Sequence, residues 1–561
     1  MIYTTCKYAP EELFAGFGEE VKRLDPNPAS FSCSDGCAHP NLCGFAKAVI
    51  EEVNRMKISR LIITDCCDAM RKTCDVLESA GMDFLYFLPL PHKTGEPEIR
   101  MFAGQLKKLK DSYAAFSKKT FSVAEAVQAC RASAVPQKTE EGKEYISLTG
   151  AHGGSMLLEQ IKTACPELMV KDDTCSGNRR YFLPDTEDAF PDTEEEFFLW
   201  YAKLLLNGLV PCMRMLDIRK RLKEDDTGLK GIVYHTIKFC DYYSFEYTGL
   251  KNRTKAPLLK IETDTTPQSS GQLKTRIEAF AETMRTLKKK EDPGTAGKKP
   301  DTDEIRYAAG VDSGSTSTDV VIMDKSGHIA GSAIVPTGMS AAKGAEKALA
   351  AALEDAGLAK DSLDVIIATG YGRDALGFPS VTEITCHAKG ARFLFGGAQT
   401  VIDIGGQDSK IIRIDEEGNV LNFIMNDKCA AGTGRFLEMQ ARALGLSMEE
   451  MSTRGNAWKN EVRISNMCTV FAESEVVSLV AKNTDIADII HGLNVSVAEK
   501  TVSLIRRGKG EPAYVMTGGV SKNPGVVSCL EEKLGCPVKV SEYSQLCGAI
   551  GAALIGLTGG R

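Results

Sequence analysis

The chain has 561 residues, of which 43% are hydrophobic and 25% are charged, so it is long enough to form at least two folded domains. Its net charge of -7 at pH 7 argues against a basic surface for DNA or RNA. No apolar run reaches the roughly 18 residues of a membrane span, and the N-terminus lacks the basic and apolar parts of a signal peptide. We therefore expect a cytoplasmic protein that binds neither nucleic acid nor membrane.

Cysteine is the unusual feature of the composition. The chain has 18 cysteines, and because disulfides are not expected in a reducing compartment, the alternative is metal or redox chemistry. Twelve cysteines precede residue 241 and six follow residue 385. This distribution predicts two separate thiol sites.

The first half of the chain alternates short apolar runs with amphipathic stretches, and this alternation predicts an α/β fold made of two doubly wound halves. The predicted strands cover residues 59–64, 84–90, 144–148, 167–170, 231–239 and 256–262. Two predicted helices cover residues 40–57 and 271–290. A stretch rich in charge, Pro and Gly at residues 286–306 predicts a linker between a domain at 1–285 and a domain at 307–561.

Several thiols lie just after predicted strands, namely Cys66, Cys67, Cys175 and Cys240. In a doubly wound sheet the carboxyl ends of the strands line the crevice where ligands bind, so these thiols are expected to converge. A loop with the sequence CSDGCAHPNLC adds Cys33, Cys37 and Cys43. Together they are enough for more than one iron–sulfur cubane. A structural zinc site would favour tight CxxC pairs, and the sequence has none.

The other cysteines of this half are expected to be core residues in helices or strands: Cys6, Cys74, Cys130, Cys165 and Cys212. His235 is either a proton donor beside the thiols or a packed histidine. The acidic run at residues 192–198 predicts the start of a helix, because carboxylates are favoured by the helix dipole there.

The second half contains an internal repeat. Residues 308–324 and 400–415 each consist of an apolar strand, an aspartate at its end, a glycine-containing turn and a second apolar strand. Each copy predicts a hairpin whose turn offers backbone N–H groups to phosphate. Two such hairpins that face one another would form a nucleotide cleft.

The candidate nucleotide-binding residues lie in these turns. Asp312 and Asp403 are the expected holders of Mg²⁺, and Gln407 is the third catalytic candidate. The candidates for phosphate binding are Gly314, Ser315, Thr316 and Thr318 in the first turn and Gly405 and Gly406 in the second. Gly518 and Gly519 end a later strand and are small enough for an adenosine to lie against the backbone.

Residues 426–438, NDKCAAGTGRFLE, place Cys429 before a run of small residues that opens a predicted helix. Glycines at such a position offer N–H groups to an anion, and the helix dipole favours a thiolate there. From the residues alone, an anion-binding loop and a metal ligand both stay open.

The order and spacing of these motifs resemble the actin-like ATPase superfamily, which includes actin, hexokinase and acetate kinase. The segments ATGYGRDAL, EITCHAKGA, NDKCAAGTGRFLE and NMCTVFAESEVVSL also resemble the activators of 2-hydroxyacyl-CoA dehydratases and the ATPase subunits of benzoyl-CoA reductase, over residues 305–560. The resemblance implies ATP and Mg²⁺, and a homodimer that holds one [4Fe-4S] cluster through Cys429 and Cys468 of each subunit. It leaves Cys386, Cys529, Cys536 and Cys547 as packing residues and His387 near the cleft.

The first half has a resemblance of its own, over residues 1–285. The segments HPNLCGFAK, TDCCDAMRK, DDTCSGNRRYF and YHTIKFCDYYSFEYTGLKNR resemble the catalytic subunits of 2-hydroxyacyl-CoA dehydratases and, more closely, the double-cubane-cluster reductases. This resemblance implies cluster ligands at Cys43, Cys67, Cys175 and Cys240, with Cys33, Cys37 and Cys66 as further candidates. Whether the cluster is a single [4Fe-4S] or a double-cubane [8Fe-9S] unit stays open.

The two resemblances together predict one polypeptide that fuses an ATP-dependent electron donor to its electron acceptor. A ferredoxin or flavodoxin would supply the electron, and a small-molecule substrate would receive it. One alternative is a 2-hydroxyacyl-CoA dehydratase with a built-in activator. Two others are a small-molecule kinase, which would share the cleft, and an ATP-controlled iron–sulfur sensor.

Overall fold

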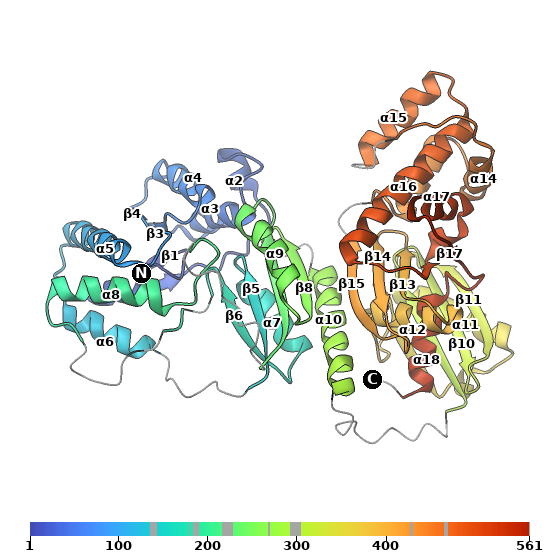
Figure 1. Cartoon of the computed structure of the whole chain (residues 1–561), viewed down its shortest axis with the longest axis horizontal. Coiled ribbons are helices and arrows are strands. Elements are labelled where there is room, and N and C mark those ends of the chain that lie inside the picture. Colours follow the sequence, from blue (N-terminus) through green and yellow to red (C-terminus); the bar gives the residue numbers. More distant parts are fainter. Residues whose placement is uncertain are drawn as a thin grey trace. The chain divides into compact units, whose positions relative to one another are not determined.

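The computed structural model describes residues 1–134, 143–177, 179–181, 183, 190–215, 228–266, 270–291, 305–426, 430–464 and 469–559. The chain forms two compact units, which we call unit 1 (Met1–Met284) and unit 2 (Arg285–Arg561). Figure 1 shows the elements of each unit, which are treated separately below. None of the helices within the described ranges has the length and apolar character needed to cross a membrane.

Unit 1 contains two parallel sheets with the same strand order. The first sheet has the order β2-β1-β3-β4, from Val21–Arg23, Ile2–Thr4, Arg60–Thr64 and Phe84–Leu88. The second has the order β6-β5-β7-β8, from Met169–Thr174, Tyr145–Gly150, Leu229–Ile237 and Leu258–Thr263. All neighbouring strands are parallel. The prediction of two α/β halves is confirmed, and in each sheet the strand order reverses beside the first strand, β1 or β5, where doubly wound folds bind ligands.

The helices of unit 1 connect these strands. They are α1 (Glu11–Ala15), α2 (Ser32–Cys37), α3 (Gly44–Met56), α4 (Asp68–Glu78), α5 (Glu96–Ser117), α6 (Val123–Ser133), α7 (Gly154–Ala164), α8 (Glu194–Gly208), α9 (Asp241–Arg253) and α10 (Ser270–Glu291). The predicted acidic helix start is α8, because Thr193 and Glu196 form a capping box there. Helix α10 continues to Glu291, so the predicted linker at 286–306 begins inside a helix.

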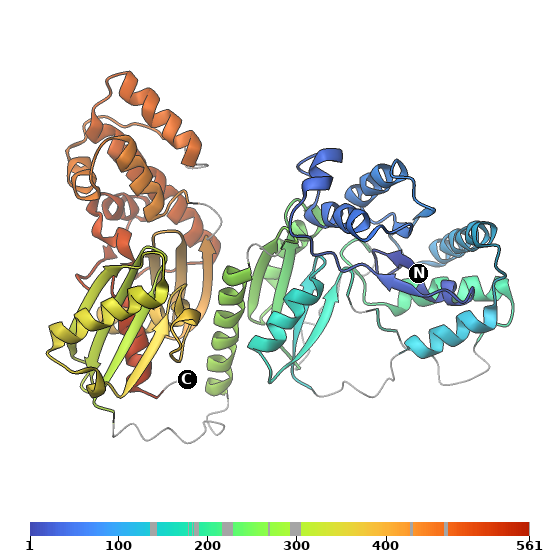
Figure 2. The same cartoon turned by 180° about the vertical axis from the view of Figure 1, so that it is seen from behind.

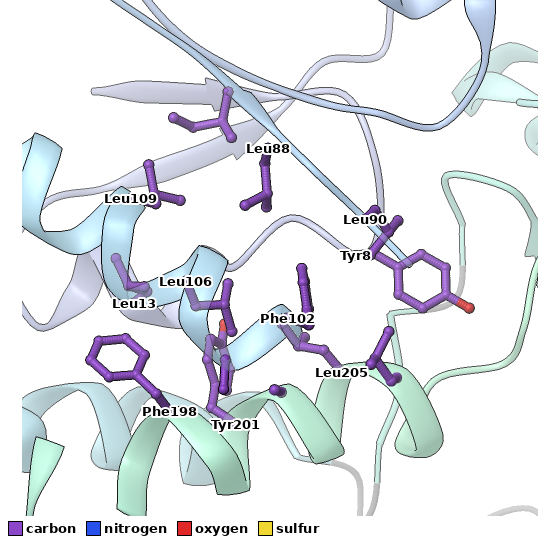
Figure 3. Close-up of a cluster of buried hydrophobic side chains, with 14 of the residues drawn as sticks. Tyr8, Leu13, Leu88, Leu90, Phe102, Leu106, Leu109, Phe198, Tyr201 and Leu205 are labelled. Atoms are coloured by element: carbon purple, nitrogen blue, oxygen red, sulfur yellow. The ribbon is translucent and has the colours of Figure 1, made fainter. Parts of the chain in front are cut away.

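The largest apolar cluster of unit 1 joins the first sheet to α5 and α8, which lie together with α6 in Figures 1 and 2. Figure 3 shows side chains from four parts of the chain meeting there, among them Tyr8, Leu88, Phe102 and Tyr201. Since these residues are distant in sequence, their burial anchors the loop that follows β1 against two long helices. That loop lies at the carboxyl edge of the sheet.

Unit 2 also contains two related sheets. The first has the order β11-β10-β9-β12, from Ile329–Pro336, Ser317–Asp324, Tyr307–Ser313 and Val365–Thr369. The second has the order β15-β14-β13-β16-β17, from Val420–Asn426, Ser409–Ile414, Thr400–Ile404, Tyr514–Thr517 and Val538–Lys539. Each begins with a three-stranded antiparallel meander and adds a strand parallel to the first one. The predicted internal repeat is therefore confirmed.

The helices of unit 2 are α11 (Ala341–Ala356), α12 (Glu383–Phe395), α13 (Gly434–Ala443), α14 (Met448–Arg454), α15 (Thr469–Ala481), α16 (Ile486–Gly508), α17 (Pro524–Leu534) and α18 (Cys547–Leu557). Short 3-10 helices cover Lys360–Ser362, Arg373–Ala375, Gly455–Ala457 and Gly519–Lys522. Helices α12 and α18 touch through their backbones, since a Cβ added at Gly551 would lie 1.8 Å from the carbonyl oxygen of Cys386. This close contact fixes the position of α12, which carries two residues of the site described next.

Candidate nucleotide and thiol sites

The two repeats of unit 2 place equivalent residues at the ends of their first strands. Asp312 lies near the end of β9 and pairs with Asp319 on β10 and Thr369 on β12. In the second repeat Asp403 lies near the end of β13, opposite Lys410 on β14 and Thr517 on β16. The predicted pair of aspartates thus occupies matching positions in the two sheets.

His387, on α12, lies between these aspartates. Its Nε2 atom is 3.8 Å from Asp312 Oδ2, and its Nδ1 atom is 3.5 Å from Asp403 Oδ1. The Thr517 hydroxyl is 3.3 Å from His387 Nδ1 and donates a hydrogen bond to Asp403 Oδ1 at 3.0 Å. The two predicted metal-binding residues are therefore brought together around one buried imidazole. The sequence analysis expected His387 near the cleft, but not its contact with both aspartates.

Lys410 is the buried cation of the site, and sequence reasoning missed it. Its Nζ atom lies 3.1 Å from Asp403 Oδ2, 2.8 Å from Asp408 Oδ1 and 3.5 Å from Glu383 Oε2. The signal was present, because Lys410 is the hairpin partner of Asp403 and so shares its buried face. Glu383, the first residue of α12, had no comparable signal.

The site carries more negative than positive charge. Burial raises the pKa of Asp312 well above its usual range, and the charges of Asp319, Glu383 and Asp403 add to the rise. Burial likewise raises the pKa of Glu383 to about 7 and that of Asp319 to about 6. Buried carboxylates that are this hard to ionise favour a cation among them.

Two orphaned atoms agree with this interpretation. Asp319 Oδ1 and Ser313 Oγ are buried and have no hydrogen-bond partner within the described structure. Oxygen atoms from carboxylates and hydroxyls are the ligands that Mg²⁺ and its waters prefer. The residues therefore fit a magnesium ion bound with a nucleotide.

Asp403 and Lys410, by contrast, are held in their charged forms. Burial alone would raise the pKa of Asp403, but the charges of His387 and Lys410 and the hydrogen bonds from Lys410 and Thr517 lower it overall. Burial alone would lower the pKa of Lys410, but Asp408, Glu383 and Asp403 raise it well above its usual value. Burial also lowers the pKa of His387, which favours the neutral imidazole.

The predicted phosphate-binding residues lie in turns that meet one another. A Cβ added at Gly406 would lie 2.3 Å from Thr316 Oγ1, so the turn holding Gly405, Gly406 and Gln407 touches the turn holding Gly314, Ser315 and Thr316. Gly518 has a φ of +81°, and a Cβ there would lie 2.8 Å from Asp403 Oδ1. Gly519 follows it at the start of a 3-10 helix. Thr318 differs from the others, because its buried hydroxyl lies 2.9 Å from Thr337 Oγ1.

Cys429 and Cys468 both lie outside the described residues, but the helices predicted after them are present as α13 and α15. Helix α13 begins against the second nucleotide turn, since Gly434 N donates to Gly405 O at 2.9 Å and Arg435 N donates to Gly406 O at 2.8 Å. It also contacts α15. The segment that opens α13 is therefore attached to the nucleotide cleft.

Some of the thiols predicted to converge in unit 1 pack against one apolar cluster, namely Cys43, Cys66, Cys67, Cys175 and Cys240. Cys43, Cys67 and Cys240 are the N-cap residues of α3, α4 and α9, and Cys175 directly follows β6. All four pack, partly buried, against one apolar cluster that also receives Cys66. We call Cys43, Cys67, Cys175 and Cys240 the thiol site. Three helix N-termini direct their N–H groups and positive dipole ends at it.

Hydrogen bonds and burial shift the pKa values of the cysteines in the thiol site. A hydrogen bond from Cys240 lowers the pKa of Cys43, assisted by backbone N–H groups at the start of α3, and the same bond together with burial raises the pKa of Cys240. Burial raises the pKa of Cys175 and of Cys67. The four thiols would become thiolates together only with a positively charged partner such as iron.

Cysteine thiolates are the donors that iron–sulfur clusters use. In the described part of the chain no three His, Cys, Asp or Glu side chains are close enough to hold one metal ion. Four cysteines around a cubane need no such closeness, because each binds a different iron. Cys33 and Cys37 lie on α2, which contacts α3, and Cys37 is exposed.

A chain of hydrogen bonds beside Cys175, which links the buried His152 and Ser176 to the exposed Asp25, was not foreseen. His152 Nε2 lies 3.1 Å from Asp25 Oδ1, and its Nδ1 atom contacts the hydroxyl of Ser176, the residue after Cys175. Both ring nitrogens of His235 also have partners, Ala151 O and Thr263 Oγ1, as in a packed histidine. The predicted core cysteines are all buried: Cys6, Cys74, Cys130, Cys165 and Cys212.

Comparison with known proteins identifies the second half of the chain. It is 45% identical over 252 residues to the activator of lactoyl-CoA dehydratase from Anaerotignum propionicum, a match that covers 44% of this chain and 96% of the relative. Residues 309–556 match the BadF/BadG/BcrA/BcrD ATPase family. The chain belongs to this ATPase family. The matched residues carry the candidate nucleotide site described above.

Two further proteins are similar to the same part of the chain. The (R)-2-hydroxyglutaryl-CoA dehydratase activating ATPase of Acidaminococcus fermentans is 43% identical over 251 residues, covering 44% of this chain and 96% of the relative. The crystal structure of component A of that organism's dehydratase is 42% identical and covers 45% of this chain and 98% of the solved chain, with a TM-score of 0.44.

Unit 1 matches a second family. Residues 6–139 and 133–284 match the 2-hydroxyglutaryl-CoA dehydratase D-component family. The chain therefore fuses a dehydratase D-component-like region to an activator-type ATPase. The resemblance predicted from the sequence is confirmed at this level.

Proposed function

We propose that the chain uses ATP in unit 2 to drive low-potential electrons to the thiol site of unit 1, where a small molecule is reduced. The fusion of the two families supports the coupling of ATP hydrolysis to electron transfer. The observation that carries the proposal is the convergence of four cysteines at three helix N-termini. Nothing in the folding of unit 1 alone requires that arrangement.

In unit 2, Asp312 and Asp403 would hold Mg²⁺ between the two sheets, and Lys410 would keep Asp403 ionised. The turn residues from Gly314 to Thr316 and Gly405 to Gly406 would bind the phosphates through their N–H groups. We assign the exposed Gln407 amide to the attacking water, because it belongs to the same turn. Thr318 has a structural role in this proposal, and Gly518 and Gly519 border the adenosine.

ATP binding would draw the two contacting turns together. Because the first N–H groups of α13 bond to Gly405 and Gly406, a shift of that turn would move α13 and the adjoining α15. We propose that Cys429 and Cys468, which precede these two helices, are cluster ligands. Two thiols per subunit supply half of the ligands of a [4Fe-4S] cluster, so the active unit would be a homodimer.

Exposed apolar side chains on α15 support a dimer contact beside Cys468. Phe471, Val477 and Val480 are 64%, 58% and 47% exposed. Three large apolar side chains on one exposed helix are typical of a surface that another chain covers. A ferredoxin or flavodoxin would reduce the shared cluster.

In unit 1, Cys43, Cys67, Cys175 and Cys240 would hold the acceptor, with Cys66, Cys33 and Cys37 as the further ligands that a double-cubane [8Fe-9S] cluster needs. An iron–sulfur cluster bound there would supply one-electron reduction at low potential. The chain's own residues bury the site and direct helix N-termini at it. We further propose that the regions 1–285 and 307–561 are joined by residues 286–306.

The test is to purify the full chain without oxygen and to measure iron, sulfide and the EPR spectrum before and after Mg–ATP addition. A dimer with double cubanes would contain about 20 irons, and one with single cubanes about 12. We expect Mg–ATP to transfer an electron from the shared cluster to unit 1. About 4 irons per dimer would mean that the thiols of unit 1 are not ligands, and the proposal would fail.

The bridging thiols are tested separately. Cys429→Ser or Cys468→Ser should lose the shared cluster and weaken the dimer, while ATP binding and the iron of unit 1 persist. Cys536→Ser, on a partly exposed thiol of unit 2, is the matched control. Full iron content and electron transfer in the first two variants would show that these cysteines only pack.

A second candidate is dehydration of a 2-hydroxyacyl-CoA, which the D-component match favours. Electron transfer to the thiol site would then start the dehydration, with no net reduction of the substrate. Incubating the reduced protein with a 2-hydroxyacyl-CoA and analysing the acyl product by mass spectrometry distinguishes the two. Loss of water from the acyl group would favour the second candidate.

A further inference from the structure

Unpartnered polar atoms occur at the carboxyl edge of the first sheet of unit 1 and on Arg214, which lies beside Tyr8 in the loop after β1. The hydroxyl oxygens of Thr5 and Thr64 are buried and have no hydrogen-bond partner, and the same is true of Arg214 Nε and Nη2. These residues are 4%, 0% and 4% exposed. Thr4 pairs with Ile62, so Thr5 and Thr64 lie near the ends of neighbouring strands, where the strand order reverses.

Arg214 is the most informative member of this group. A guanidinium keeps its proton under all ordinary conditions, so Arg214 is a buried cation. It makes no ion pair with any described residue, and its Cζ atom lies 5.6 Å from the centre of the Tyr8 ring. A buried charge without a partner destabilises the fold. Among the described residues Arg214 has no counter-charge, and an anion bound from solution would supply one.

The two unpartnered nitrogen atoms of Arg214 indicate which anion would fit. Nε and Nη2 form the side edge of the guanidinium, where two parallel N–H bonds point in the same direction. This pair matches the two oxygens of a carboxylate or phosphate. Lys7, which is fully buried and donates to Thr174 O at 3.2 Å, adds a second cation from the loop after β1.

Arg214 lies between the first sheet and the thiol site. Its neighbours Cys212 and Met215 pack in the cluster that contains Cys6 and Tyr8, whereas Met213 packs in the cluster that receives the thiol site. Cys175 packs against both clusters. In Figure 3 the Tyr8 hydroxyl points away from the labelled leucine and phenylalanine side chains.

Because the residue before Arg214 packs in the cluster that receives the thiol site, an anion held by Arg214 would lie close to that site.

We propose that Arg214 binds an oxyanion, a carboxylate or phosphate group of the small molecule that is reduced in unit 1, through Nε and Nη2, with the Thr5 and Thr64 hydroxyls as further donors. This assignment of a substrate class rests on the proposed function. Anion binding requires neither ATP nor an electron, so this proposal and the proposed function can fail separately.

The test uses the full-length protein with the nucleotide site saturated by a non-hydrolysable Mg–ATP analogue, so that phosphate cannot bind there. Inorganic phosphate and acetate are the probes, and binding is measured by calorimetry. We expect one anion-binding site per chain. Its affinity should fall by roughly tenfold or more in Arg214→Gln, and Arg214→Lys should keep part of that affinity. The matched control is Arg100→Gln, on the exposed face of α5.

A second variant separates ligand binding from a structural role. Arg214→Met removes the buried charge at similar volume, so without anion it should melt at a higher temperature than the wild type, and added phosphate should not stabilise it. A lower melting temperature, or equal phosphate affinity in Arg214→Gln and wild type, would overturn the proposal. So would an altered EPR spectrum in Arg214→Gln with unchanged anion binding, since Arg214 would then serve a cluster. Intact anion binding without ATP-driven reduction would count against the proposed function instead.

Discussion

The two sites of this chain are built with opposite charge surpluses. In unit 2 the carboxylates of Asp312, Asp319 and Glu383 outnumber the nearby cations, and burial raises their pKa values. In unit 1 the thiol site faces three helix N-termini, and Arg214 lies unpaired near it. The comparison teaches that the fold places opposite charges at its two sites. Buried carboxylates dominate the site of unit 2, whereas helix N-termini and a guanidinium surround the thiols of unit 1.

The strongest way to break this comparison is to remove a thiol. Cys67→Ser or Cys240→Ser should abolish the iron of unit 1 and all substrate reduction, because each removes a ligand at a helix N-terminus. ATP hydrolysis in unit 2 should persist. Iron analysis and an ATPase assay of the same sample check this. Cys165→Ser, a buried thiol outside the site, is the control, and equal iron in all variants would contradict the assignment.

The complementary change removes the cation site of unit 2. Asp312→Ala or Asp403→Ala should abolish ATP hydrolysis while the iron content stays unchanged, because the carboxylates hold Mg²⁺ and not iron. Phosphate release and iron analysis measure the two effects. Asp361→Ala, on an exposed 3-10 helix, is the control. Unaltered hydrolysis in both aspartate variants would end the assignment of the nucleotide site.

Lys410 sharpens the comparison, because it is the one cation in direct contact with the described carboxylates Asp403, Asp408 and Glu383. Lys410→Met leaves these groups without their counter-charge and should destabilise the nucleotide-free protein by about 3–5 kcal/mol. Urea unfolding measures the loss. Adding Asp403→Asn to Lys410→Met should recover part of it, and additive losses would show that the pair is not coupled.

The charge surplus of unit 2 also predicts a dependence of stability on pH. The pKa of Glu383 is about 7 in the folded chain, compared with an ordinary 4.5, so the folded state binds the extra proton. Stability without nucleotide should therefore fall as pH rises from about 4.5 to 7, by on the order of 1 to 3 kcal/mol. Melting temperatures of wild type and Glu383→Gln measure this, with the exposed Glu354→Gln as control. A fall of the same size in Glu383→Gln would show that another group is responsible.

The smallest effect is expected at His152, which links Asp25 to Ser176 beside Cys175. His152→Ala removes these hydrogen bonds and should lower stability by about 1–3 kcal/mol, and it should make the iron of unit 1 easier to remove by a chelator. The exposed His92→Ala is the control. Chelation at the wild-type rate would mean that this chain of hydrogen bonds does not position Cys175.

Local sequence was sufficient for most strands of unit 1 and for many candidates in each site. The alternation of apolar runs predicted the second sheet of unit 1 and β3 and β4 of the first, but not the short strands β1 and β2, and the repeated aspartate and glycine turns predicted the first hairpin of each sheet of unit 2. Periodicity and turn chemistry involve neighbouring residues, so they can be interpreted without the fold. The thiols Cys43, Cys67 and Cys240 could be placed at strand ends or helix starts for the same reason.

Long-range packing was needed for the partners of those candidates. His387 meets both aspartates only because α12 is held against α18 by backbone contact at Gly551. Lys410 becomes a buried cation only when the hairpin register sets it opposite Asp403. Arg214 lies in a segment with no motif, and its unpaired charge appears only when two apolar clusters close around it. Burial and charge balance depend on residues distant in sequence, and therefore only the folded chain determines them.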